Sequence, residues 1–227
     1  MAKATEQELR IAVPNAGEVS ALLARPANAR WIMALAHGAG AGMRHPFLAA
    51  LAAELAAAGV ATLRYQFPYM EEKKGRPDSP EVAAATVAAA VKAAQKAASG
   101  LPVLAGGKSF GGRMSSTAAA EGLLPEARGL VFFGFPLHPP KRPGTKRAEH
   151  LRKVNIPMLF LQGTRDELAD LSLLRPIVEE LGARATLHVM ESADHSFHVL
   201  KKSGKTDAGV LKELAETTAK WAASCCG

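Results

Sequence analysis

Apolar residues in this chain gather into short runs that alternate with longer alanine-rich stretches. The first two runs, residues 9–13 and 19–23, flank the turn sequence Pro14-Asn15-Ala16-Gly17, a pattern typical of a β-hairpin. Most of the later runs are continuously apolar, which predicts strands that are buried on both faces. These strands are expected at residues 31–36, 60–65, 102–106, 128–135, 158–162 and 185–190.

Helices are predicted in the stretches between the later strands. Pro46 and Gly59 supply the start and stop signals of the first helix. A loop at residues 66–69 and a charged segment that ends at Pro80 precede the second helix. The helices are expected at residues 47–58, 81–98, 109–122, 171–182 and 207–223.

This order of elements predicts an α/β fold. A β-hairpin followed by repeated strand–helix units favours a mostly parallel sheet of about seven to eight strands with helices on both faces. The sequence has no internal repeat and no linker, so residues 1–227 are expected to form one domain. The loop at residues 136–143 is short and rich in proline, which leaves little room for a lid at this edge of the sheet.

The composition is that of a globular protein, since 48% of the 227 residues are hydrophobic. The net charge is +7, but the basic residues are scattered apart from small clusters such as Lys73-Lys74-Gly75-Arg76. No aromatic residues interleave with these clusters, which favours a role of the charge in solubility over nucleic-acid binding. An affinity for anionic substrates is the functional alternative.

The cysteines and the N-terminal residues favour a cytoplasmic location. Cys225 and Cys226 are adjacent and are expected to lie in a tail, so the chain has no disulfide framework. Residues 1–10 are polar and unlike a signal peptide. The long alanine-rich runs carry charges, so no membrane span is expected.

The candidate nucleophile lies between a predicted strand and a predicted helix, in the pattern Gly107-x-Ser109-x-Gly111. Such a pattern builds a sharp turn that exposes a serine hydroxyl, because glycine on either side lets neighbouring backbone approach closely. The pattern also occurs by chance in glycine-rich loops. A phosphate-binding loop is disfavoured, because it requires glycine where Pro102 stands.

An activated serine needs a histidine base and a carboxylate that orients the base. Asp166 follows the predicted strand at residues 158–162, and His195 follows the one at 185–190, so both should reach the same edge of the sheet as Ser109. Their alternative roles are a helix N-cap and a surface turn, respectively. The weaker candidates are Asp194, Glu167 and Asp170 for the acid and His198 for the base.

The oxyanion of the transition state needs backbone N–H donors. The N–H groups of Phe110 and Ala39 are expected to supply them, with Gly40 as the alternate to Ala39. His37 is expected to brace this loop, because it precedes the serine on another strand. No metal is expected, since the other histidines, His45, His138, His150 and His188, lack the spacing of metal ligands.

Three side chains are expected to line the substrate pocket: Lys108, Arg44 and Tyr69. Lys108 and Arg44 would favour an anionic substrate. Lys108 is alternatively a solvated residue of the turn. With little lid above it, the pocket is expected to be shallow and to favour short acyl groups.

Together these segments resemble the α/β-hydrolase superfamily, in its small lidless members similar to dienelactone hydrolase. More narrowly, the chain resembles the branch that includes a testis-expressed protein and a chromatin-complex subunit with hydrolase-like domains. The resemblance implies the fold and a Ser-Asp-His triad, but no particular substrate. True dienelactone hydrolases use cysteine where this chain has Ser109. The segments that carry the resemblance are residues 37–40, 64–69, 106–113, 135–140, 162–166 and 193–196.

The function expected is that of a serine hydrolase that cleaves a small ester, or a thioester or amide, through an acyl-enzyme. It would need no cofactor and would act as a monomer or homodimer on a small-molecule substrate, without nucleic-acid partners. The main alternative is a catalytically silent hydrolase-fold scaffold, although an intact triad in the correct chain order argues against it. A serine peptidase is disfavoured, because 227 residues leave no room for a gating domain.

Overall fold

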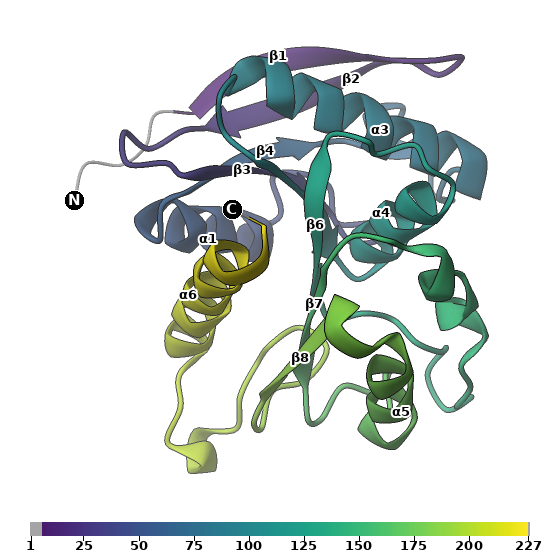
Figure 1. Cartoon of the computed structure of the whole chain (residues 1–227), viewed down its shortest axis with the longest axis vertical. Coiled ribbons are helices and arrows are strands. Elements are labelled where there is room, and N and C mark those ends of the chain that lie inside the picture. The colour runs from purple at the N-terminus through teal and green to yellow at the C-terminus, as the bar shows by residue number, and fades with distance from the viewer. Residues whose placement is uncertain (1–5, 227) are drawn as a thin grey trace.

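The computed structural model describes residues 6–226, in which helices cover both faces of an eight-stranded sheet (Figure 1). The strand order across the sheet is β1-β2-β4-β3-β5-β6-β7-β8. The strands are β1 (Glu6–Val13), β2 (Gly17–Ala24), β3 (Trp31–Ala36), β4 (Val60–Tyr65), β5 (Val103–Lys108), β6 (Ala127–Phe133), β7 (Met158–Gly163) and β8 (Ala185–Met190).

The sheet is antiparallel only at its first edge. β1 pairs with β2 as a hairpin, β2 pairs antiparallel with β4, and every later pair is parallel. The hairpin turns through Asn15 and Gly17, which both adopt positive φ, a conformation favoured by glycine and tolerated by asparagine. The predicted mostly parallel α/β sheet is confirmed.

The helices divide between the two faces of the sheet. α3, α4 and α5 pack on one face, and α1 and α6 pack on the other, as Figure 1 shows. The α-helices are α1 (Pro46–Ala57), α2 (Pro68–Glu71), α3 (Pro80–Ala97), α4 (Phe110–Ala120), α5 (Leu171–Leu181) and α6 (Asp207–Cys225). Short 3₁₀ helices are η1 (Lys146–Lys153), η2 (Gly182–Arg184) and η3 (Lys201–Ser203).

Alternate residues of the central strands feed two separate cores. In β3, Ile32 faces the core beneath α3 and α4, whereas Trp31 and Met33 face the core beneath α1 and α6. Every residue of β3 and β4 is buried. This two-sided burial explains why the strands are continuously apolar in sequence.

Three features differ from the sequence-based expectations. The loop after β4 contains the short helix α2, and the segment between β6 and β7 contains η1. The C-terminal cysteines do not form a free tail, because α6 extends to Cys225 and Cys226 is buried beside Trp221. The Gly129 backbone leaves the space that Cys226 occupies, since a Cβ on Gly129 would lie 2.7 Å from the Cys226 sulfur.

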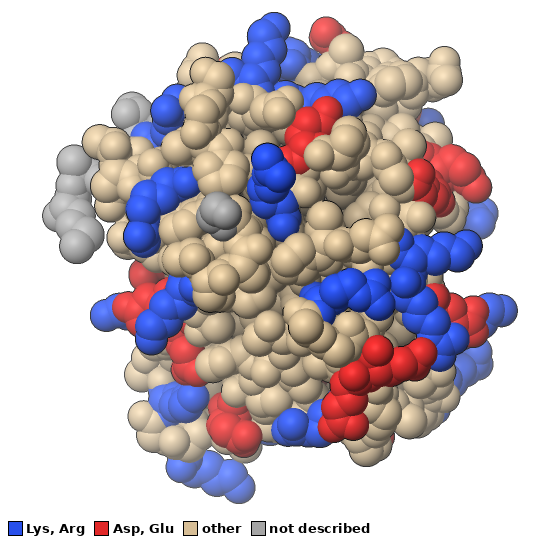
Figure 2. Space-filling view, in the orientation of Figure 1, with Lys and Arg blue, Asp and Glu red and all other residues tan. Residues whose placement is uncertain are grey.

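The connection between β6 and β7 forms no lid over the sheet edge, as the short proline-rich loop predicted. Lysine and arginine side chains are dispersed among acidic and uncharged ones on the face shown in Figure 2. No helix of residues 6–226 combines the length and the apolar character needed to cross a membrane.

Candidate active site

Ser109 occupies the turn between β5 and α4 in a strained backbone conformation, with φ of 49° and ψ of −111°. The flanking glycines are required by close backbone contacts. A Cβ on Gly107 would lie 2.2 Å from the Ala36 carbonyl oxygen, and a Cβ on Gly111 would lie 2.6 Å from the Ala36 Cβ. The turn therefore wedges against the end of β3 and projects the serine side chain from the carboxyl edge of the sheet.

Ser109, His195 and Asp166 form a continuous hydrogen-bond chain. The Ser109 hydroxyl lies 2.9 Å from His195 Nε2, and His195 Nδ1 lies 2.7 Å from Asp166 Oδ2. The Asp166 side chain is only 1% exposed, whereas that of His195 is 23% exposed. This arrangement can move a proton from the serine to the imidazole, while the buried carboxylate holds the imidazole in one tautomer.

Two further donors hold the Asp166 carboxylate in place. The Leu168 N–H donates to Oδ1 at 2.8 Å, and the Gln162 side-chain amide donates to Oδ2 at 2.5 Å. The amide oxygen of Gln162 in turn accepts the Phe135 N–H at 2.9 Å, which fixes the orientation of the amide. Gln162 is fully buried, and no role is assigned to it from the sequence. A polar residue at the end of an apolar strand, four residues before Asp166, is the signal that could have identified it.

The competing acids and the competing base have other partners. Asp170 caps α5 by accepting the Ser172 N–H at 2.8 Å. Asp194 accepts the N–H groups of Ser196 and His198 within the turn that carries His195. The imidazole of His198 pairs instead with Asp207 at the start of α6, at 2.7 Å. Glu167 follows Asp166 in the chain but, within residues 6–226, forms no hydrogen bond or ion pair with His195.

The backbone donors proposed for the oxyanion lie on both sides of Ser109. Phe110 is the first residue of α4, so its N–H has no partner within the helix. In the loop after β3, the Gly40 N–H is already used, because it donates to the Tyr69 hydroxyl at 2.9 Å. This contact favours Ala39 over Gly40 as the second donor.

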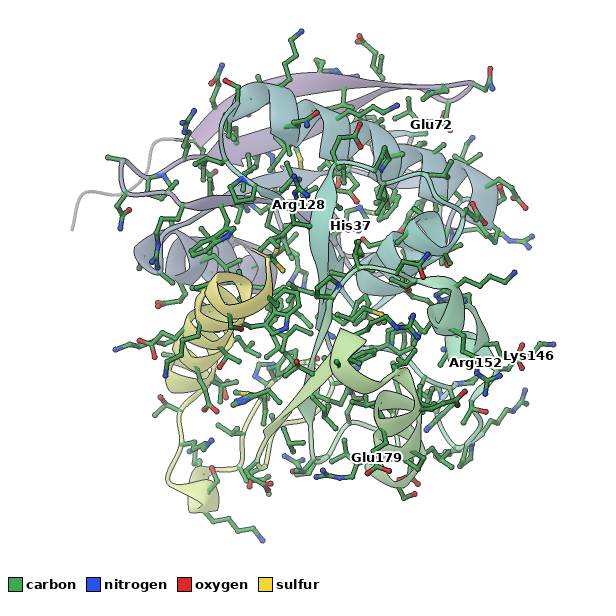
Figure 3. The ribbon with its side chains drawn as sticks, viewed as in Figure 1. His37, Glu72, Arg128, Lys146, Arg152 and Glu179 are labelled. Carbon is green, nitrogen blue, oxygen red and sulfur yellow. The ribbon has the colours of Figure 1, made fainter. Side chains whose placement is uncertain are left out.

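His37 braces that loop from within the protein. Its Nδ1 donates to the Gly38 carbonyl at 2.7 Å, and its Nε2 accepts the Phe67 N–H at 3.2 Å. The residue is fully buried, and burial lowers the pKa of His37 to about 4. The imidazole is therefore neutral near pH 7. Figure 3 shows His37 in the middle of the molecule, away from the surface groups Lys146 and Arg152.

Comparison with known proteins identifies the fold family. A family model described as an alpha/beta hydrolase domain matches residues 29–223. The chain belongs to the α/β-hydrolase family. The match spans Ser109, Asp166 and His195.

Solved α/β hydrolases from three bacteria share the fold. A dienelactone hydrolase from Anabaena variabilis is 22% identical with a TM-score of 0.78, and the alignment covers 100% of both chains. A lidless α/β serine hydrolase from Xanthomonas campestris is 20% identical with a TM-score of 0.74, over 95% of this chain and 94% of that one. A serine hydrolase homologue from Coxiella burnetii is 21% identical with a TM-score of 0.75, over 97% and 99% of the two chains.

The side chains expected to line the substrate pocket of this α/β hydrolase have other positions. The Lys108 ammonium is sealed from solvent beside Gly134 and the Phe197 ring, so it is not solvated and does not face an open pocket. Arg44 is 60% exposed and pairs with Glu8 of β1. Tyr69 is buried, and its hydroxyl accepts the Gly40 N–H instead of facing an open cavity.

A hollow of about 460 Å³ opens next to Asp166. It extends from Asp166 and Ala169 to the loop at Lys141 and Pro143, so it adjoins the triad from the β7 side. Residues 6–226 include no group of three or more His, Cys, Asp or Glu side chains that could hold a metal ion.

Proposed function

We propose that this α/β hydrolase is a serine esterase that acts on a small ester through an acyl-enzyme. The observation that carries the proposal is the unbroken hydrogen-bond chain from Ser109 through His195 to Asp166. The strained turn at Ser109 supports it further, because non-glycine residues hold such a conformation only where the surrounding structure enforces it. Thioesters and amides are the less favoured substrates of the same site.

The first half of the reaction forms the acyl-enzyme. Ser109 Oγ attacks the acyl carbon while His195 Nε2 takes the serine proton. Asp166 stabilises the imidazolium that results, and the N–H groups of Phe110 and Ala39 bind the oxyanion. The tetrahedral intermediate then collapses. The bond to the leaving oxygen breaks, and His195 returns the proton to that oxygen.

The second half releases the acid. Water attacks the acyl carbon while His195 takes one of its protons, and the bond to Ser109 Oγ breaks as His195 returns a proton to the serine. The 23% exposure of the His195 side chain is consistent with the entry of this water. The lidless edge of the sheet is consistent with small substrates that need no cover.

The proposal extends to the setting of the enzyme. We propose a cytoplasmic monomer or homodimer that needs no cofactor and binds neither nucleic acid nor membrane. The narrower resemblance to the branch of the testis-expressed protein and the chromatin-complex subunit belongs to this proposal as well. Its support is the six sequence segments that carry the resemblance.

Labelling with a fluorophosphonate, read by intact mass, tests the activated serine. Wild-type protein should take up one adduct, and Ser109→Ala should take up none and lose at least about 10³-fold in ester turnover. Ser224→Ala on α6 serves as the matched control and should label like wild type, because its hydroxyl only donates to the Trp221 carbonyl. Labelling of folded Ser109→Ala, or no adduct on folded wild type, would favour a catalytically silent scaffold.

A further inference from the structure

Two half-buried arginines next to the nucleophile turn have no acidic partner. Arg113 lies in the first turns of α4, and Arg147 lies in η1. Within residues 6–226, neither guanidinium has a carboxylate oxygen within 4.0 Å. Arg184, a third half-buried arginine, also lacks a carboxylate partner but donates to main-chain carbonyl oxygens, including that of Arg152 at 3.3 Å. Arg113 and Arg147 are therefore half-buried arginines whose charge no carboxylate balances within the described residues.

Both arginines are held by segments that also contact the proposed triad. The Arg113 N–H donates to the Ser109 carbonyl at 3.0 Å, one helical turn from the nucleophile. Side chains of a helix lean toward its N-terminus, which here is the catalytic edge of the sheet. The Arg147 guanidinium lies 3.5 Å from the Pro136 carbonyl, in the loop after β6. That loop begins at Gly134, where a Cβ would lie 3.4 Å from His195 Nδ1.

The two positive charges are brought together at a cost in free energy. Burial lowers the pKa of Arg113, and the charge of Arg147 lowers it further. Like charges that are partly removed from water repel one another unless an anion balances them. The two guanidinium groups, which can form bidentate hydrogen bonds, thus lie without a balancing carboxylate on α4, which begins directly after Ser109, and on η1, which contacts α4 through His150 and Ser116 at 2.7 Å.

The neighbouring side chains supply no negative charge. The Ser116 hydroxyl donates to the Arg113 carbonyl at 2.8 Å, so His150 Nε2, at 2.7 Å, is the donor to Ser116. Burial and Arg113 lower the pKa of His150 to about 4, which keeps this imidazole neutral. Glu149, the carboxylate of η1, is exposed. After Glu180, the main cause, its charge contributes to the raised pKa of Arg152.

The strand order decides which part of a substrate would meet the arginines. β5, which ends at the nucleophile, lies between β3 and β6. The Ala39 loop follows β3, so the oxyanion is held on the β3 side. The remainder of a bound ester can then extend over the β6 side, toward α4 and η1.

We propose that Arg113 and Arg147 form a subsite for a carboxylate or phosphate group carried by the ester substrate. This inference rests on the proposed esterase function and narrows its substrate class to short anionic esters. A half-ester of a short dicarboxylic acid has the required form, with a reacting ester at one end and a charged group at the other.

A pair of esters of matched length tests the subsite. Monomethyl succinate carries a carboxylate where methyl butyrate carries a methyl group. The ratio of kcat/KM for the charged ester to that for the neutral ester should fall at least about tenfold in Arg113→Gln and in Arg147→Gln, because each loses a charge-assisted hydrogen bond. Arg147→Lys should retain part of the ratio.

The control removes one positive charge elsewhere. Arg175 is exposed on α5, and Arg175→Gln should keep the wild-type ratio. Thermal unfolding of each variant verifies that it is folded. An unchanged ratio in the folded double variant Arg113→Gln/Arg147→Gln would overturn the subsite, even if both esters are hydrolysed.

A binding measurement separates this inference from the proposed function. In Ser109→Ala, titration calorimetry with succinate and with inorganic phosphate should detect binding of at least one anion, and the anion that binds identifies the group recognised. The same titrations of Ser109→Ala carrying Arg113→Gln and Arg147→Gln should detect none. If wild type hydrolyses neither ester, the esterase proposal fails and these titrations alone decide the subsite. Absence of binding by both anions would overturn it.

Discussion

Lys108 directly precedes Ser109, the proposed nucleophile, yet its ammonium group is buried inside the protein. The ammonium nitrogen is sealed from solvent, lies 5.6 Å from the centre of the Phe197 ring and has no hydrogen-bond partner among the described residues. Burial lowers the pKa of Lys108 to about 8, while the carboxylates of Asp166 and Asp194 oppose this shift. Near pH 7 the protein therefore carries a buried positive charge that costs stability.

Lys108→Met should stabilise the fold at pH 7. Because the pKa of Lys108 falls from 10.5 to about 8 on folding, the unfolded chain binds the proton more tightly. Wild type therefore gains stability as the pH rises from about 8 to 10.5, and loses that gain as the pH falls again. The methionine variant should exceed wild type by up to about 3 kcal/mol at pH 7, with the difference closing above pH 8.

Urea unfolding between pH 7 and pH 10 measures this difference. Lys92→Met, at an exposed position on α3, should match wild type throughout. A lower free energy of unfolding for Lys108→Met than for wild type at pH 7 would show that the buried ammonium is stabilising.

At the scale of elements, the turn between β5 and α4 has the form that the sequence predicts. The glycine spacing predicted a strand, a sharp turn and a helix, and all three are present. The strands β3, β4 and β8 were predicted to the residue, because each run ends abruptly at glycine or at a polar or charged residue.

Other elements could not be predicted from local pattern. η1 is strongly polar and buries only Ala148 and Leu151, so its form depends on packing against α4. Arg147 is a residue of η1. The local sequence therefore gives no indication that Arg147 lies near Arg113. The direction of the Lys108 side chain likewise depends on Gly134, a residue from another strand end. The catalytic roles of Ser109, Asp166 and His195 stay predictions until they are tested.

Gly111→Ala should disrupt the turn. The added methyl group would lie 2.6 Å from the Ala36 Cβ and 2.7 Å from the His37 carbonyl oxygen, so α4 and β3 would have to separate. We expect a loss of about 3 kcal/mol in stability, as for overpacked cores. Fluorophosphonate labelling of Ser109 should also slow at temperatures where the variant is folded. Gly75→Ala is the control, because a methyl group there meets open space. Equal stability of the two variants would contradict the close contact between the turn and β3.

At the scale of the whole molecule, burial on both faces of the sheet leaves buried histidines sensitive to acid. His37 and His150 each have a pKa lowered to about 4, His37 by burial and His150 by burial and the charge of Arg113. Their contribution to stability is complete above the unfolded value of 6.5 and is lost as the pH falls toward 4. Because the unfolded chain takes up a proton at His37 over this range and the folded protein does not, His37 alone lowers the free energy of unfolding by up to about 3 kcal/mol.

His150→Gln should lessen this sensitivity. Glutamine can still donate to Ser116 but does not titrate, so the stability of the variant should fall less steeply than that of wild type between pH 6.5 and pH 4. Guanidinium unfolding at half-unit pH steps provides the comparison. Parallel pH profiles for the two proteins would show that His150 titrates alike in the folded and unfolded states, which contradicts the lowered pKa.

The position of the nucleophile strand in the middle of the sheet has a consequence for how the chain could be divided. The triad residues and Phe110 all follow the exposed segment at residues 73–77, whereas Ala39 precedes it. Across that division, residues 32–36 of β3 pair in parallel with residues 103–107 of β5. A chain cut at this segment would yield two fragments, each holding one of the two proposed oxyanion donors. Ester hydrolysis would then report the reunion of the fragments, which makes the seam between β3 and β5 a natural site for a split-enzyme sensor.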